Sequence, residues 1–176
     1  APNPTFVGTS GTLLGAASGT VANSWNAGNT TGSPGCVCSV VTRSDGLGRN
    51  QRCVVTSAAN NDAVTIRTGN LASNVAIGDT VYWECSASLV SVTALQALRT
   101  FIQYKVDGGA YVYVYGMANS TTTCDTTDLS EIVLRTPNLT FAGTTINEVY
   151  FGVQVIHTGV GGSTLEVGRA HARKVN

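Results

Sequence analysis

The sequence predicts an all-β fold, an antiparallel β-sandwich of the jelly-roll type with an extended N-terminal arm. Short segments rich in Val, Ile, Thr, Tyr and Phe recur along the chain between Gly, Asn, Asp and Pro residues, which is typical of strands joined by turns. Apolar and polar residues alternate within several segments, as in strands that bury one face. Almost no segment has helical periodicity. Two packed sheets explain this pattern, and an up-and-down barrel fits the strand count nearly as well.

The first 30 residues are predicted to form the extended arm, and residues 31–176 the sandwich domain. Gly, Ala, Ser and Thr dominate residues 1–30, which show no sustained periodicity beyond a short strand near Thr12–Leu14. Trp25, in the segment NSWNAGN, lies outside the expected strands. Two roles fit Trp25: it pins the arm onto the sandwich, which we favour, or it is a platform for a ligand.

Nine strands are expected after the arm, and they cover residues 36–43, 51–58, 63–69, 79–88, 98–106, 110–116, 131–137, 146–159 and 163–175. Alternation is clearest in 79–88, where Val81, Trp83 and Cys85 share one face. In 146–159, the apolar face is expected to carry Val149, Phe151, Val153 and Val155.

Turn residues predict how these strands are linked. The Asp-Gly-Gly sequence at 107–109 is expected to close a hairpin, and GVGGS at 159–163 is expected to close another. The segment SLVSVTALQAL (88–98) is short and has no capping residues. We interpret it as a loop or a single turn.

Composition restricts the partners of the chain. Its 176 residues suit one domain, only 11% of them are charged, and ten basic residues balance ten acidic ones. Nucleic-acid binding needs a basic footprint and is therefore not expected. No run of about 18 apolar residues occurs, so no membrane span is expected.

The five cysteines are an odd number, and their pairing is open. No CxxC motif or Cys/His cluster of zinc spacing occurs, so a structural zinc site is not expected. Most cysteines are interpreted as buried thiols, with at least one disulfide as the alternative. Cys36 and Cys38 share a strand face, so a partner would come from another strand or chain. Cys124, in a polar run, is expected to be the most exposed thiol, and these three are the candidates for an inter-chain disulfide.

No catalytic constellation is expected, and no cofactor. GTSGT (8–12) lacks the Gly-x-Ser-x-Gly spacing of a nucleophile elbow. The two histidines, His157 and His171, are interpreted as solvated residues near strand ends. One loop carries three nearby carboxylates that a calcium ion could use, with a plain polar loop as the alternative: Asp125, Asp128 and Glu131.

The most distinctive surface candidate is the run AYVYVYG. Tyr111, Tyr113 and Tyr115 alternate with valines and therefore share one strand face. That face could stack on a glycan, contact another subunit or belong to the core. For a glycan, the polar groups that fix the ligand are expected from Gln103, Asn119 or Arg99.

Three segments also carry a resemblance. The opening NPTFVGTSGT…SGTVANSW, the central VAIGDTVYWEC and the closing STLEVGRAHARKV resemble a jelly-roll module of bacteriophage tail and virion proteins. That module is similar to carbohydrate-binding modules and is often appended to SGNH-type hydrolases or fibre domains. The resemblance runs from Asn3 to Val175 and implies a jelly-roll fold. The five cysteines and the lack of an attached enzyme domain favour a free-standing virion component.

Two functions are therefore expected, neither of them enzymatic. The first is a module that binds glycan or a host surface as part of a tail fibre or adhesin. The second is a decoration or cementing protein that stabilises a virion lattice. The expected partners are cell-surface glycan or other virion proteins, at the virion surface or outside the cell. A homo-oligomer is also expected, with a trimer favoured.

Overall fold

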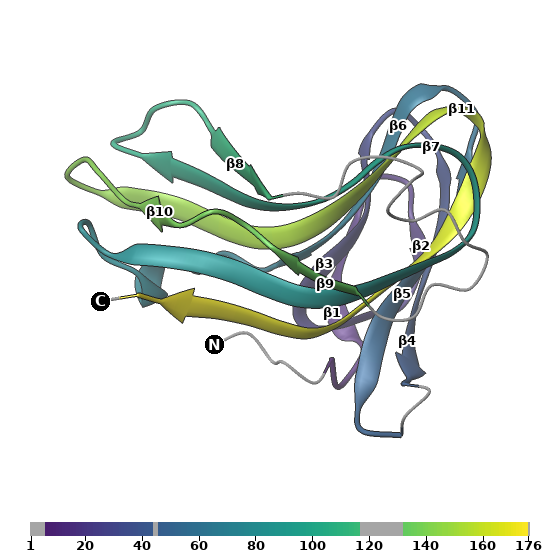
Figure 1. Ribbon diagram of the computed structural model, residues 1–176, viewed down its shortest axis with the longest axis horizontal. Helices are drawn as coiled ribbons and strands as arrows, with labels where there is room; N and C mark the ends of the chain where they lie inside the picture. Colours follow the sequence, from purple (N-terminus) through teal and green to yellow (C-terminus); the bar gives the residue numbers. More distant parts are fainter. Residues whose placement is uncertain (1–5, 44–45, 117–131, 176) are drawn as a thin grey trace.

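The chain folds as a β-sandwich, which confirms the predicted fold class. The computed structural model describes residues 6–43, 46–116 and 132–175 (Figure 1). One short 3-10 helix, Ala72–Asn74, occurs in these ranges. The strands are β1 (Ser10–Leu14), β2 (Ser18–Gly19), β3 (Val21–Thr31), β4 (Gly35–Thr42), β5 (Arg49–Ser57), β6 (Asn60–Thr68), β7 (Thr80–Val106), β8 (Val112–Gly116), β9 (Ile132–Arg135), β10 (Leu139–Thr140) and β11 (Ile146–Lys174).

Two long strands, β7 and β11, organise the sandwich because each contributes to both layers. In Figure 1 both run along the molecule, bend at one end and return. Their halves near residues 95–106 and 146–156 pair with each other and, with β8, β6, β3 and β1, make the first layer. Their halves near 80–93 and 162–174 pair likewise and, with β5, β4, β2, β9 and β10, make the second layer.

The continuity of these strands corrects two expectations. Residues 88–98 are strand rather than loop, and GVGGS at 159–163 lies within β11 rather than closing a hairpin. Ser91 and Ala94 adopt positive φ within β7, at 55° and 53°, and the β7–β11 register shifts between His157 and Gly162. Such irregularities bend strands without ending them. Gly162 serves close approach, because a Cβ there would lie 2.5 Å from the Val55 carbonyl oxygen.

The hairpin at 107–109 is confirmed. Asp107 and Gly108 both have positive φ, at 52° and 70°, and the Gly109 amide donates to the Val106 carbonyl at 2.9 Å. Positive φ at both central positions is the backbone of the type I′ turn, whose twist matches that of antiparallel strands. This turn joins β7 to β8, whose observed register pairs Tyr104 with Val112.

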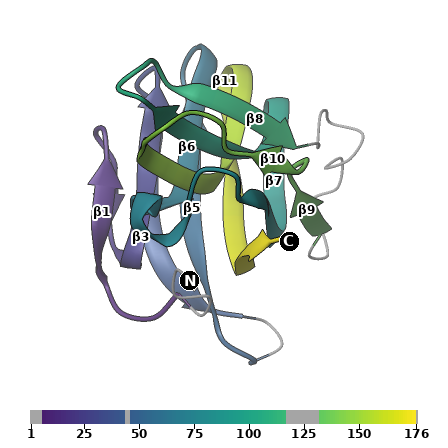
Figure 2. The same cartoon turned by 90° about the vertical axis from the view of Figure 1, so that its left-hand side faces the viewer.

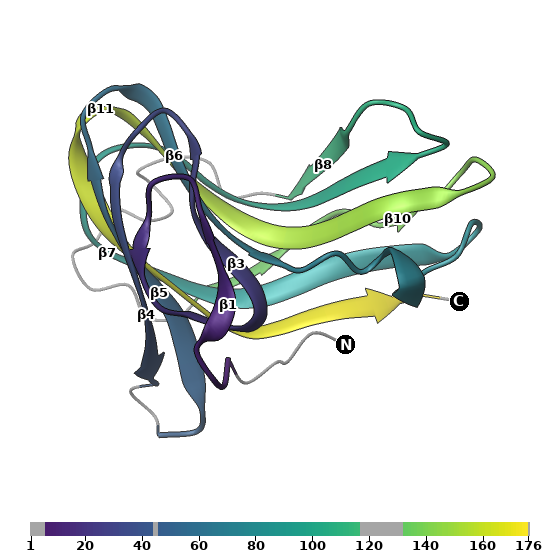
Figure 3. The same cartoon turned by 180° about the vertical axis from the view of Figure 1, so that it is seen from behind.

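The N-terminal segment differs from the expected arm. β1 pairs with β3 in parallel, β3 pairs with β6, and β2 pairs with β4 in parallel, so residues 10–31 belong to the sheet (Figures 2 and 3). Glycines, asparagines and the positive φ of Ser24 (64°) interrupt the alternation of β3, which explains why no period is visible in the sequence.

Aromatic packing holds the layers together. Trp25 of β3 and Trp83 of β7 are both fully buried. Trp25 stacks on Phe6, with ring centroids 4.3 Å apart, and lies 5.9 Å from Trp83. Trp83 in turn stacks on Phe151 at 5.8 Å. Trp25 thus pins the N-terminal segment onto the core, and its expected alternative role as a ligand platform is wrong.

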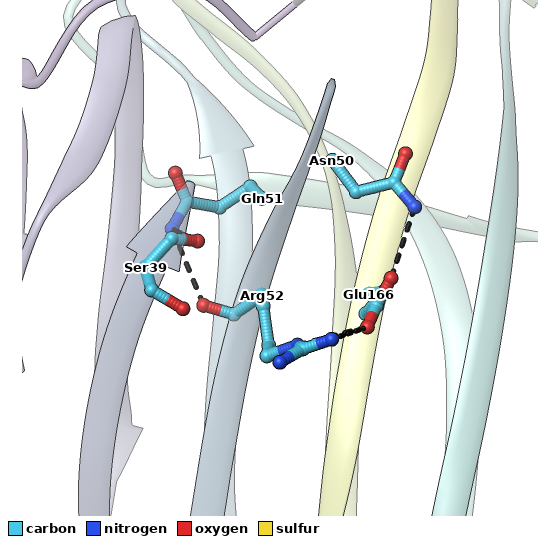
Figure 4. Close-up of polar contacts among 5 residues, drawn as sticks. All are labelled: Ser39, Asn50, Gln51, Arg52 and Glu166. Atoms are coloured by element: carbon cyan, nitrogen blue, oxygen red, sulfur yellow. Dashed lines mark hydrogen bonds and ion pairs between the residues drawn. The ribbon is translucent and has the colours of Figure 1, made fainter. Parts of the chain in front are cut away.

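A buried amide stabilises the edge where β2 leads into β3. The Gln51 side chain is fully buried, and its oxygen accepts from the Ala22 amide at 2.8 Å. Its nitrogen donates to the Thr20 carbonyl at 3.1 Å and to the Ser39 and Arg52 carbonyls at 3.0 and 3.3 Å; Figure 4 draws Gln51 with Ser39 and Arg52. Its neighbours face outward, and Arg52 donates twice to Glu166 across β5 and β11. The Arg52 side chain is 40% exposed, so this ion pair adds only modest stability, whereas the buried amide bonds to four backbone groups.

The burial of the cysteine side chains decides two of the predictions made for them. The four cysteines that the structure describes, Cys36, Cys38, Cys53 and Cys85, are buried free thiols, as expected for most of the five. An inter-chain disulfide through Cys36 or Cys38 is therefore wrong for this fold, because both lie inside the core. Cys124 lies outside the described residues.

In the described ranges, no helix is long and apolar enough to cross a membrane.

The first prediction concerns Trp25. Trp25→Ala should lower the free energy of unfolding by about 3–5 kcal/mol, because it empties a fully buried site between two rings. Urea unfolding measures the change. Val160→Ala, at an exposed position of β11, should stay within about 0.5 kcal/mol. A loss below about 1 kcal/mol for Trp25→Ala would place this residue outside the core.

The second prediction concerns His157, which was expected to be solvated but is fully buried. Burial lowers the pKa of its imidazole from the usual 6.5. In the unfolded chain the side chain binds a proton below about pH 6.5, but the folded state resists that proton. The contribution of neutral His157 to the free energy of unfolding should therefore be fully present above about pH 6.5. It should be lost as the pH falls toward the pKa of His157 in the folded state.

Thermal unfolding between about pH 7.5 and 5.5 measures this dependence. His157→Leu should flatten it. Val160→Leu, at an exposed site on the same strand, should leave it unchanged because it removes no titratable group. Equal slopes for the wild type and His157→Leu would contradict the assignment.

Candidate functional site: a tyrosine-lined face of the first layer

Alternation along four strands gives the first layer one polar and aromatic face. On β7, Ile102 faces the core while Phe101 and Gln103 face outward, and Gln103 lies directly opposite Tyr113 of β8 and Tyr150 of β11. The same rows continue onto β6. We call this surface the tyrosine face; its residues are Tyr111, Tyr113, Tyr115, Arg99, Phe101, Gln103, Tyr150, Gln154, Thr65 and Arg67.

The three tyrosines of β8 and of the residue directly before it are exposed, so they are not part of the core. Tyr111, Tyr113 and Tyr115 keep 44%, 46% and 42% of their surface in solvent. The rings of Tyr113 and Tyr115 are nearly parallel, at 12°, with centroids 5.7 Å apart. Of the three expectations for this run, the core is excluded, while a glycan surface and a subunit contact stay open.

Hydrogen bonds fix the Tyr113 side of the face. Arg67 donates from Nη1 to Gln103 Oε1 at 2.6 Å, and Gln103 donates from Nε2 to the Tyr113 hydroxyl at 2.7 Å. Gln103 is 6% exposed, so its amide is held in one orientation. The Arg67 guanidinium also lies 4.2 Å above the Tyr150 ring. Tyr113 is thus positioned before any ligand arrives.

A second set of contacts fixes the Tyr115 side. The Arg99 guanidinium lies 3.8 Å from the Tyr115 ring centroid, which is cation–π distance. Arg99 also donates from Nε and Nη2 to Gln154 Oε1 at 3.1 and 2.8 Å. Gln154 in turn donates to the hydroxyls of Thr30 and Thr65 at 3.3 and 3.4 Å. The ring is held by a network that crosses four strands.

Glu148 joins two tyrosine hydroxyls at one end of the face. Tyr111 and Tyr150 each donate to Glu148 Oε2 at 2.6 Å. The hydrogen bond from Tyr111, followed by that from Tyr150, lowers the pKa of the Glu148 carboxyl. Burial, with the hydrogen bond to the carboxylate, raises the pKa of Tyr150 to about 12. At neutral pH this end therefore presents a carboxylate with two neutral phenols.

The centre of the face is shallow. Phe101 forms part of its floor and contacts Tyr113 at 6.3 Å between centroids. Gly152 leaves room for this packing, since a Cβ there would lie 2.6 Å from Phe101 Cζ and 2.7 Å from Arg67 Cβ. The depression between these residues measures only about 50 Å³. A ligand would therefore lie along the surface rather than enter a cavity.

The structure brings some predicted site residues together and not others. Tyr111, Tyr113, Tyr115, Gln103 and Arg99 share the tyrosine face, whereas Trp25 lies in the core. The other polar candidates lie outside the described residues: Asn119 and the calcium candidates Asp125, Asp128 and Glu131. Sequence reasoning missed Arg67, Gln154, Tyr150 and Glu148. The alternation of residues 146–159 held a signal for Tyr150 and Gln154, because it sets them on the face opposite the predicted apolar one.

Several solved structures have a fold similar to that of this chain. The chain is similar to carbohydrate-binding modules of the β-sandwich superfamily described for promiscuous specificity (TM-score 0.61, 18% identity, 85% of this chain and 57% of that chain). It is also similar to the CBM22-1 xylan-binding domain of Paenibacillus barcinonensis Xyn10C (0.57, 12%, 86% of each chain). A third likeness is to the enzymatically active domain of bacteriophage CBA120 tailspike protein 4 (0.51, 11%, 87% of this chain and 20% of that chain).

These likenesses show the fold, a β-sandwich similar to that of carbohydrate-binding modules. Identities of 11–18% show the fold alone. This chain spans only 57% of the length of the first of these proteins. No protein-family model and no curated protein matches the sequence.

The third prediction tests the packing beneath the face. Gly152→Ala should lower the free energy of unfolding by about 1–3 kcal/mol, because the added methyl overlaps Phe101 and Arg67. Urea unfolding measures the loss. Gly159→Ala is the matched control on the same strand, where a Cβ meets nothing within 4 Å, and should be nearly neutral. Equal stability of the two variants would show that the floor is not tightly packed.

Proposed function

We propose that this chain binds an extended carbohydrate along the tyrosine face and performs no reaction on it. The observation that carries the proposal is the pair of exposed, nearly parallel rings of Tyr113 and Tyr115. Apolar faces of sugar rings stack on aromatic rings, and adjacent amide and guanidinium groups hydrogen-bond to hydroxyls. The carbohydrate-binding-module fold supports the same reading.

The layout of the face favours a chain of sugars over a single one. Tyr111, directly before β8, and Tyr115, within it, are four residues apart, which spans about 13 Å of extended chain. The depression is too small to enclose a ring, so binding relies on a row of surface contacts. The two hydrogen-bond networks hold the tyrosine side chains in place, which reduces the side-chain entropy lost on binding.

We further propose that the carbohydrate belongs to a bacterial cell surface and that the chain serves as a module of a phage tail fibre or related adhesin, acting outside the cell. The fold likeness to a tailspike domain supports this assignment, together with the sequence resemblance to tail and virion modules. The competing function is that of a decoration protein, in which another subunit covers the tyrosine face.

The fourth prediction tests the tyrosine pair. On an array that carries bacterial surface polysaccharides and xylans, the wild type should bind a bacterial polysaccharide. By calorimetry, Tyr113→Ala and Tyr115→Ala should each weaken that binding at least about tenfold, or 1.4 kcal/mol. Tyr82→Ala is the matched control: Tyr82 lies on the second layer, with Arg135 3.7 Å from its ring, and should bind as the wild type does.

The alternatives give different results. Binding to xylan alone would support carbohydrate binding by this chain. It would overturn the proposal that the chain is a module of a phage tail fibre. No binding to any glycan, together with a stable oligomer in sedimentation that Tyr113→Ala dissociates, would favour the decoration protein. Binding that survives both tyrosine variants refutes the assigned face.

A further inference from the structure

Three cysteines that are scattered in the sequence meet inside the second layer. Cys36 and Cys38 alternate along β4 and so share its inward face, and Cys38 lies directly opposite Cys53 of β5. The Cys38 sulfur is 3.4 Å from that of Cys53 and 3.8 Å from that of Cys36. All three sulfurs lie within 4.8 Å of one another.

The cluster is closed to solvent. Cys36, Cys38 and Cys53 are 4%, 2% and 0% exposed. Their neighbours in the sheet are apolar, with Val55 opposite Cys36 and buried Leu165 opposite Cys53. Small hydrophobic residues would fill such a site equally well. Three adjacent sulfurs therefore point to a bound species that thiol groups coordinate.

The spacing suits a metal ion. Metal–thiolate bonds of about 2.3 Å around a trigonal ion hold the sulfurs about 4.0 Å apart. The Cys38–Cys53 and Cys36–Cys38 separations, 3.4 and 3.8 Å, lie slightly below that value, and all three sulfurs are within 4.8 Å of one another, so small side-chain rotations suffice. A disulfide requires about 2.05 Å, which is much shorter than either measured contact.

We propose that Cys36, Cys38 and Cys53 bind one soft metal ion, with Cu(I) as the matching ion. Within the described ranges, no His, Asp or Glu joins the three sulfurs. Structural zinc sites almost always take four ligands, whereas thiolates without other donors select soft ions such as Cu(I). Binding changes no oxidation state; each sulfur that carries a proton releases it to water as its bond to the metal forms.

The bound ion would tie β4 to β5 near the edge of the second layer. β4 also holds β2 in parallel, and the Thr20 amide donates to the Cys38 carbonyl at 2.8 Å. Metal binding to the folded state would stabilise this edge by linkage. The CxC spacing gives no zinc motif in the sequence; only the pairing of β4 with β5 brings Cys53 to the site.

The fifth prediction is a copper titration of the full chain. All proteins carry Cys124→Ser, are kept reduced and anaerobic, and receive Cu(I) buffered by bicinchoninate. The reference protein should retain one Cu(I) per chain and melt at a higher temperature when loaded. Cys38→Ala and Cys53→Ala should each lose at least tenfold in Cu(I) affinity, whereas Cys85→Ala, at a buried thiol elsewhere in the core, should retain the ion.

X-ray absorption of the loaded reference protein keeps the test independent of how the variants fold. Three sulfur neighbours around copper would support the site. A first shell containing nitrogen, no retained copper, or unchanged affinity in Cys38→Ala would overturn it. A Cys38–Cys53 disulfide in peptide maps of the chain purified without reductant would overturn it as well.

Discussion

The fit of Trp83 between Trp25 and Phe151 is the constraint on which the rest of the structure depends. Trp83 comes from the second layer, and the two rings beside it come from the first. β7 and β11 both pass through the two layers. The contact of Trp83 with Trp25 and Phe151 therefore fixes the position of β7 relative to β11. A one-residue slip would turn every side chain of a strand to its opposite face.

The tyrosine face follows from the same register. The alternation that buries Ile102 and Phe151 turns Gln103 and Tyr150 outward, and the register of β7 with β8 sets Tyr113 opposite Gln103. The binding groups therefore stand on paired strands rather than on loops. Strands hold side chains in fixed rows, and the Arg67–Gln103–Tyr113 contacts add a second restraint.

The sequence predicted the parts that depend on local alternation and turn chemistry. A period of two residues predicted the buried faces of residues 79–88 and 146–159 and the shared face of the three tyrosines. A turn signal, Asp-Gly-Gly, predicted the hairpin at 107–109. What it missed depends on pairing between distant segments. Trp25 lies in a strand whose glycines and positive-φ Ser24 hide the alternation, and Arg67 reaches the face only because β6 pairs with β11.

The continuity of β7 and β11 was missed for a related reason. Glycine-rich segments predict turns when strands are short, but here Gly162 allows the close approach of β5 to β11 while the strand continues. The result places two chemistries on opposite layers of one core. The tyrosine face lies on the halves of β7 and β11 that pair with β8 and β6, and the sulfur cluster lies on β4 and β5, beside the half of β11 that pairs with β5. Since the tyrosine face is the outer side of the first layer and the cluster lies on the inner side of the second, changes at the cluster should act on stability while the tyrosine face keeps its geometry.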